Sequence, residues 1–129
     1  MNMRIFFERK KQVIAKYNGH RIVTDQPLHA GGEGTAPAPF DLFMASIGTC
    51  AGIYVKSFCD KRGIPTDNIS LEQNMKFDDQ THRVTFLEII IKLPGDFPQK
   101  YKSALLNVAN MCAVKRHLLD PPEMSVVLD

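Results

Sequence analysis

Three cysteines, Cys50, Cys59 and Cys112, are the side chains of this sequence best suited to covalent chemistry. A thiolate is a strong nucleophile, and two neighbouring thiols can be oxidised to a disulfide. Three is an odd number, and the spacing is neither short nor regular, unlike the paired framework of a small secreted domain. We therefore expect reduced thiols and a cytoplasmic location.

Cys50 lies in a run of small residues, ASIGTCAG, which would let another backbone or a substrate approach closely. By residue type alone, a small core side chain is the commoner interpretation of such a cysteine. The string GTCAG also matches a nucleophile elbow with cysteine in place of serine. That elbow requires a preceding strand and a parallel sheet, whereas a helix and antiparallel hairpins are expected here, which argues against a hydrolase.

The other two cysteines differ in their sequence surroundings. Cys112 is followed by Lys115 and Arg116 at helical spacing, where the two cations either approach its sulfur and favour the thiolate or point to water. Cys59 comes nine residues after Cys50, which in a helix places it on the opposite side, about half a turn away. We expect Cys59 to be structural.

A long helix should carry Cys50 and Cys59. Pro39 suits a first helical turn and Asp41 favours the helix dipole, so the helix is expected to begin near residues 38–40. Cations, then glycine and proline, predict its end at Arg62. Its residues are apolar or small on nearly every face, so we expect a buried core helix. Its longest uncharged stretch, residues 42–55, is shorter than the roughly 20 residues that a membrane span needs.

The remaining segments predict antiparallel strands and two shorter helical segments. Strands are expected over 4–8, 12–17 and 20–25, with Asn18-Gly19 as a hairpin turn, and over 69–77 and 83–93, the last resembling a central strand. Apolar residues recur at helical spacing after Pro98, and 113–119 can continue as a second helical segment before a closing strand over 124–128. The fold class is therefore α+β, in a single domain spanning residues 1–129.

Composition excludes several classes of function. The chain has 16 basic and 14 acidic residues, dispersed along its length, so neither nucleic acid nor a membrane is an expected partner. The four histidines are scattered and there is no Cys-x-x-Cys, so no metal site is predicted. The glycine-rich segment 31–35 lacks the lysine of a phosphate-binding loop, and we expect no cofactor.

Three stretches together resemble the OsmC/Ohr family: GGEGTAPAPFDLFMASIGTC, then KRGI at the end of the helix, then NVANMCAVKRHL. The resemblance covers residue 30 to the C-terminus. It implies an OsmC-like fold and an intertwined homodimer, in which antiparallel strands of both chains wrap around two long buried helices.

The resemblance also implies an activity, because better-studied members reduce organic hydroperoxides. Cys50 would then be the thiolate that attacks the hydroperoxide, Cys112 the resolving thiol that closes a disulfide, and an external dithiol the reductant. The alternative is a redox-inactive dimeric binding protein with an apolar pocket at the subunit interface.

The sequence departs from the family pattern at two positions and leaves the family's arginine unassigned. Phe40 stands where the hydroperoxide-resistance branch has a glutamate that holds an arginine, and Asp41 follows one place later as the candidate substitute. Ala113 stands where a proline usually follows the second cysteine. Since no Lys or Arg lies within a turn of Cys50, we expect an arginine from the N-terminal strands, first Arg21, to reach it across the dimer.

Overall fold

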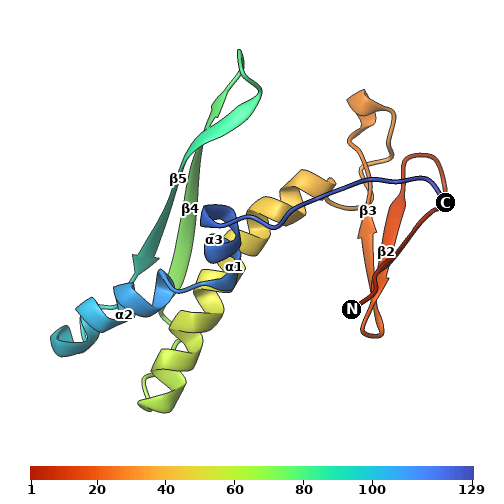
Figure 1. The fold of residues 1–129 in the computed structure, drawn as a ribbon. Coiled ribbons are helices and arrows are strands. Elements are labelled where there is room, and N and C mark those ends of the chain that lie inside the picture. The colour runs from red at the N-terminus through yellow and green to blue at the C-terminus, as the bar shows by residue number, and fades with distance from the viewer. The chain divides into compact units, whose positions relative to one another are not determined.

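Residues 1–45 contain a three-stranded antiparallel sheet in the order β1 (Arg4–Phe7), β2 (Val13–Tyr17) and β3 (His20–Thr24) (Figure 1). Asn18 and Gly19 both have positive φ, 49° and 77°, as a two-residue hairpin turn between β2 and β3 requires. The three strands and this turn confirm what the sequence predicted. A loop with a short 3-10 helix over Leu28–Ala30 then leads to helix α1.

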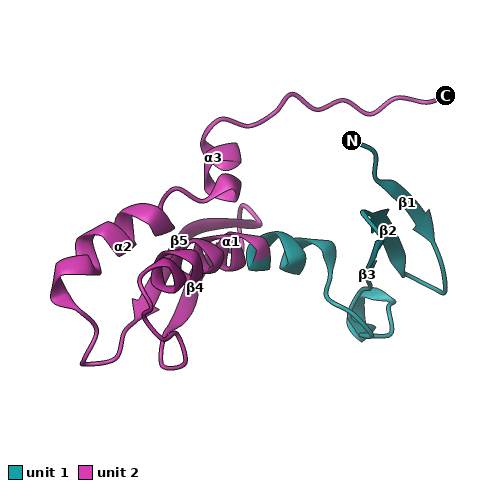
Figure 2. Ribbon diagram, turned by 90° about the horizontal axis from the view of Figure 1, so that it is seen from below, with its two compact units in different colours: residues 1–45 teal, residues 46–129 magenta.

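The computed structural model describes all 129 residues as two compact units, residues 1–45 and residues 46–129 (Figure 2). The division falls inside α1 (Pro39–Lys61). The expectation of one domain over residues 1–129 stays a prediction. Residues 46–129 contain the rest of α1, the hairpin of β4 (Ser70–Asp78) and β5 (Arg83–Lys92), a 3-10 turn (Gln99–Tyr101), α2 (Lys102–Ala109) and α3 (Ala113–Leu119).

Helix α1 begins and ends within one residue of the predicted bounds. Gly63 has a φ of 65°, and the N–H of Ile64 donates to the carbonyl of Cys59 at 2.9 Å, so a left-handed glycine closes the helix. The buried positions of α1 in residues 46–129 lie on one face of the helix: Ile47, Ala51, Val55, Phe58 and Cys59.

Only one face of α1 is covered in this chain, which corrects the expectation of a helix buried all round. Ile53, on the opposite side, is 57% exposed. The covered face packs into a core with Phe97 of the loop after β5 and Leu105 of α2. By length and composition alone α1 would be able to cross a membrane, a property that core helices share. Its packed face supports the core interpretation.

The C-terminal half of the sheet prediction needs two corrections. Strand β5 pairs only with β4, so within the chain it is not a central strand although residues 89–91 are half-buried. Residues 124–128 form no strand, and their apolar side chains are exposed, Val126 and Leu128 completely. Both segments have the composition of strands but find no partner strand within the chain.

Candidate functional site

The fold of residues 46–129 brings the thiols of Cys50 and Cys112 together, although they come from distant parts of the sequence. Cys50 lies half-buried on α1, and Cys112 lies just before α3 with 2% of its surface exposed. The two side chains are hydrogen-bonded to each other, and both are free thiols. Two neighbouring thiols can be oxidised to a disulfide.

The beginning of α3 surrounds both sulfurs with backbone donors. Cys112 is the N-cap of α3, and its Sγ accepts a hydrogen bond from the N–H of Lys115 at 3.3 Å. The N–H groups of Ala113 and Val114 donate to the sulfur of Cys50. Backbone donors hold a thiolate better than a thiol, because the anion is the stronger acceptor.

These contacts decide the acidity of Cys50. Burial is the largest influence and by itself would raise the pKa of the Cys50 thiol. The hydrogen bonds from Val114, Cys112 and Ala113, together with the charge of Arg116, outweigh it and lower the pKa below its usual range. The thiolate, the form that attacks electrophiles, is therefore favoured at Cys50.

The sequence left two alternatives for the cations after Cys112, an approach to its sulfur or a direction toward water. The ammonium of Lys115 instead donates to Oδ1 of Asn110 at 2.6 Å, and only the backbone N–H of Lys115 contacts Cys112 Sγ. Arg116 acts through its charge on Cys50. Sequence reasoning missed Asn110 and the donors at Ala113 and Val114. Ala113 carried one usable signal, since alanine keeps an N–H that proline lacks.

Cys59 is separate from this pair, as predicted. It is fully buried in the core with Val55, Phe58 and Leu105. Burial, followed by the negative charge of Asp60, raises the pKa of the Cys59 thiol. A buried, protonated thiol is a poor nucleophile, which agrees with a structural role.

An apolar pocket of about 280 Å³ opens beside Cys112. One wall is the face of β5 formed by the alternating residues Leu87, Ile89 and Ile91, and further walls come from α1, α2 and α3. Asn110 and Lys115 are the polar and charged groups of its lining. The pocket can therefore accept an apolar molecule in reach of the Cys112 thiol.

Gly48 explains part of the small-residue run around Cys50. A Cβ at this position would meet Oε1 of Gln73 on β4 at 2.5 Å. The atom met is the far end of a flexible side chain, so a larger residue would displace Gln73 about half a turn of α1 from the thiol.

The other two candidate residues, Asp41 and Arg21, belong to residues 1–45 and have partners there. Oδ2 of Asp41 accepts a hydrogen bond from the N–H of Ala38 at 3.2 Å, which caps the start of α1. Arg21 forms an ion pair with Glu8 at 2.5 Å. A role for either residue at Cys50 stays a prediction.

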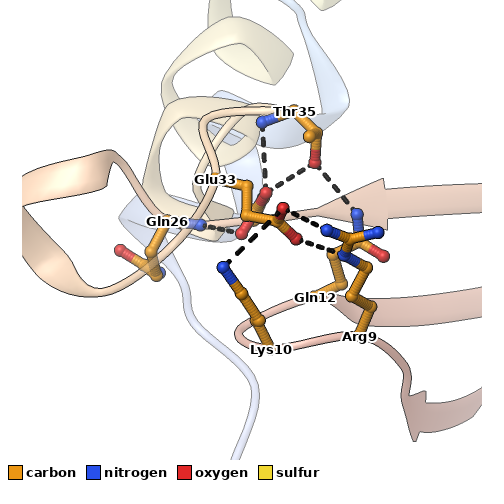
Figure 3. Close-up of polar contacts among 7 residues, drawn as sticks. Arg9, Lys10, Gln12, Gln26, Glu33 and Thr35 are labelled. Carbon is orange, nitrogen blue, oxygen red and sulfur yellow. Dashed lines mark hydrogen bonds and ion pairs between the residues drawn. The ribbon is translucent and has the colours of Figure 1, made fainter.

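A polar cluster around Asp25 and Glu33 holds the loop before α1 (Figure 3). The carboxylate of Asp25, which is fully buried, accepts hydrogen bonds from the N–H of Gln26 and from both the N–H and the hydroxyl of Thr35. Glu33 in the same loop binds Arg9 with two contacts of 2.7 Å. These contacts tie the end of β3 and the β1–β2 turn to the loop before α1. No group of three His, Cys, Asp or Glu side chains is arranged to hold a metal ion.

This arrangement agrees with the family to which the sequence is matched. The family described as OsmC-like protein matches residues 32–127, which is 96 of the 129 residues, and the chain belongs to this family. No curated protein matches the sequence significantly.

Solved structures share the fold at low sequence identity. An osmotic stress-induced and detoxification response protein of Psychrobacter arcticus is 20% identical, with a TM-score of 0.74 over 90% of this chain and 86% of its own. An organic hydroperoxide resistance protein OsmC of Legionella pneumophila is 18% identical, with a TM-score of 0.57 over 91% and 87%. OhrB of Bacillus subtilis, an organic hydroperoxide resistance protein, is 16% identical, with a TM-score of 0.50 over 89% and 87%. These similarities support the α+β fold with antiparallel strands.

Proposed function

We propose that the protein reduces organic hydroperoxides through Cys50 and Cys112. The observation that carries the proposal is the hydrogen-bonded pair of free thiols, one of which has a lowered pKa, beside an apolar pocket. Membership of the OsmC-like family and the hydroperoxide resistance proteins among the structural neighbours support a peroxide-related role.

The reaction has two steps in this chain. The Cys50 thiolate attacks the terminal oxygen of a hydroperoxide, the O–O bond breaks, and an alcohol leaves with one added proton, giving a sulfenic acid at Cys50. Cys112 then attacks the sulfenic sulfur, and the Cys50–Cys112 disulfide forms with loss of water. An external dithiol reduces the disulfide by thiol exchange and returns both thiols. No metal or cofactor takes part in this scheme.

Trapping the sulfenic acid tests the order of attack. We expect dimedone to label Cys50 in the Cys112→Ser variant after one equivalent of cumene hydroperoxide, with no adduct in Cys50→Ser. An adduct only on Cys112 would reverse the two roles. In the unsubstituted chain, mass spectrometry of peptides should show one Cys50–Cys112 disulfide and an unmodified Cys59.

A redox-inactive binding protein is the alternative that the apolar pocket also favours. Such a protein would hold an apolar ligand against the β5 wall formed by Leu87, Ile89 and Ile91 without consuming hydroperoxide. One equivalent of hydroperoxide separates the two proposals. If both thiols stay titratable with a thiol reagent after an hour, the binding function is the correct one.

We further propose that the protein acts as a homodimer in the cytoplasm. The exposed face of α1 at Ile53 and the exposed apolar residues Met124, Val126 and Leu128 are surfaces that a second copy would cover. The free thiols fit a reducing compartment. A stable folded monomer at micromolar concentration in analytical ultracentrifugation would rule out the dimer.

A further inference from the structure

The short connection between α2 and α3, which carries Cys112, is held by side-chain contacts at both of its ends. At the α2 end, Nδ2 of Asn110 donates to the carbonyl of Leu106 at 3.1 Å. At the α3 end, the ammonium of Lys115 donates to Oδ1 of the same Asn110 at 2.6 Å. Asn110 therefore uses both atoms of its amide to tie the end of α2 to the first turn of α3.

The same Lys115 also contacts the sulfur of Cys112. Its backbone N–H donates to Sγ at 3.3 Å, while its side chain reaches back to Asn110. Lys115 therefore links Asn110 to the sulfur of Cys112, through its ammonium on one side and its backbone N–H on the other. A separate bond from the N–H of Met111 to the carbonyl of Val108 at 3.0 Å keeps the start of the connection in place.

We propose that Asn110 and Lys115 are positioning residues for the resolving thiol, and that their contact holds Cys112 in the place from which it attacks Cys50. The part of this inference that concerns hydroperoxide turnover rests on the proposed function. The contact between Asn110 and Lys115 itself bears only on closure of the Cys50–Cys112 disulfide. Closure joins two sulfurs of one chain, so its rate depends on how much of the time they are within reach and aligned.

The two residues are exposed, so their effect on closure should be moderate. An ammonium–amide hydrogen bond at the surface contributes much less than a buried one. We expect Asn110→Ala and Lys115→Met each to slow disulfide closure about threefold to tenfold, and the double variant to slow it no more than the stronger single variant. Lys115→Arg retains a donor for Asn110 and should restore most of the rate.

Two assays on the full chain separate this inference from the proposed function. The first measures the sulfenic acid and the disulfide separately after hydroperoxide, by quenching with dimedone and with an alkylating agent. The second drives closure with diamide, which accepts two electrons and two protons from the thiol pair and becomes the hydrazine. Lys102→Met, which removes an exposed cation from α2, is the matched control and should close at the unsubstituted rate.

Positioning predicts slower closure with both hydroperoxide and diamide, and rescue by Lys115→Arg. Because Asn110 and Lys115 also line the pocket, closure is measured as the rate at which sulfenic acid is converted to disulfide. If Asn110→Ala closes as fast as the unsubstituted chain, the contact has no positioning role. If only Lys115→Met is slow, the charge of Lys115 acts without Asn110, and the inference is wrong. If the unsubstituted chain closes with diamide but not with hydroperoxide, the proposed function fails while the variants still test the contact.

Discussion

Two acidic side chains in different units have pKa values lowered mainly by hydrogen bonds, yet they serve different purposes. The hydroxyl of Thr35 and the backbone N–H of Gln26 are the leading influences that lower the pKa of Asp25. Burial opposes a similar set of donors at Cys50, and the donors prevail there too. A lowered pKa by itself therefore does not identify a functional site.

The two groups differ in their surroundings. Asp25 is fully buried, and its partners belong to the strand end and loop that it holds together. Cys50 is half-buried and touches Cys112, a second group capable of the same chemistry that also lines an apolar pocket. At a thiol with a reaction partner and a neighbouring pocket, a lowered pKa supplies the thiolate that reacts. At a fully enclosed carboxylate, it stabilises the folded structure.

The largest effect is expected from removal of the nucleophile. Cys50→Ser should lower the rate of hydroperoxide reduction by at least about 100-fold, because a hydroxyl is not ionised at neutral pH. Asp25→Asn should change the same rate by less than about twofold per folded molecule. The measurement is consumption of cumene hydroperoxide with dithiothreitol as reductant. Equal losses in the two variants would remove the distinction between the clusters.

The next largest effect is on stability and concerns the cluster around Asp25. Asn in place of Asp25 presents an NH₂ group to donors, so we expect Asp25→Asn to lower Tm by on the order of 5 °C at pH 7. Asp79→Asn, at an exposed turn, is the control and should melt like the unsubstituted chain.

The pH dependence of this stability has a definite sign. The folded pKa of Asp25 is lowered, so its stabilisation is complete above the ordinary aspartate value of about 4 and is lost as pH falls through the folded value. The difference in Tm between the unsubstituted chain and Asp25→Asn should therefore shrink as the pH is lowered from about 5 to about 2, the range in which carboxyl groups usually titrate. A difference independent of pH would show that the charge of Asp25 does not contribute.

A smaller effect tests which cation favours the Cys50 thiolate. Arg116→Gln removes the charge acting on Cys50, so its pKa should rise and alkylation by iodoacetamide at pH 7 should slow about twofold to fivefold, with the difference shrinking in high salt. Arg21→Gln tests the expectation from the sequence, which placed an arginine of the N-terminal strands at Cys50. A tenfold or greater loss in Arg21→Gln alone would assign the activation to those strands.

The sequence was most informative where a pattern is local. The Asn18-Gly19 turn, the bounds of α1 and the segment 113–119 all follow from capping, turn and periodicity rules, and the structure confirms them. The candidate thiols were also evident, because residue type limits which groups can do redox chemistry.

The contacts that set acidity were not predictable in the same way. Whether Lys115 turns to Cys112 or to Asn110 depends on how the connection between α2 and α3 folds, which spacing does not determine. The donors to Cys50 are backbone groups of Ala113 and Val114, and backbone N–H groups leave no mark in a sequence. The predicted strand over 124–128 has the right composition but no partner strand in the chain, since strand propensity does not supply pairing.

The smallest effect on reactivity is expected at Cys59. It is a thiol on the same helix as Cys50, but it packs against Val55, Phe58 and Leu105 with none of its surface exposed. Cys59→Ser should leave hydroperoxide reduction within about twofold of the unsubstituted rate while costing about 1–2 kcal/mol of unfolding free energy, because it buries a hydroxyl in apolar surroundings. A hydrogen bond from the serine hydroxyl to the carbonyl one turn earlier in α1 limits that cost.

Denaturant unfolding measures the stability loss at Cys59, and cumene hydroperoxide consumption measures the rate. In the folded chain, iodoacetamide should label Cys50 well before Cys59, because burial and then Asp60 raise the pKa of the Cys59 thiol. If Cys59→Ser abolished the disulfide while Cys50→Ser left it intact, the reactive pair would have been assigned to the wrong face of α1. Cys59, and not Cys50, would then be the acidic group with a reaction partner.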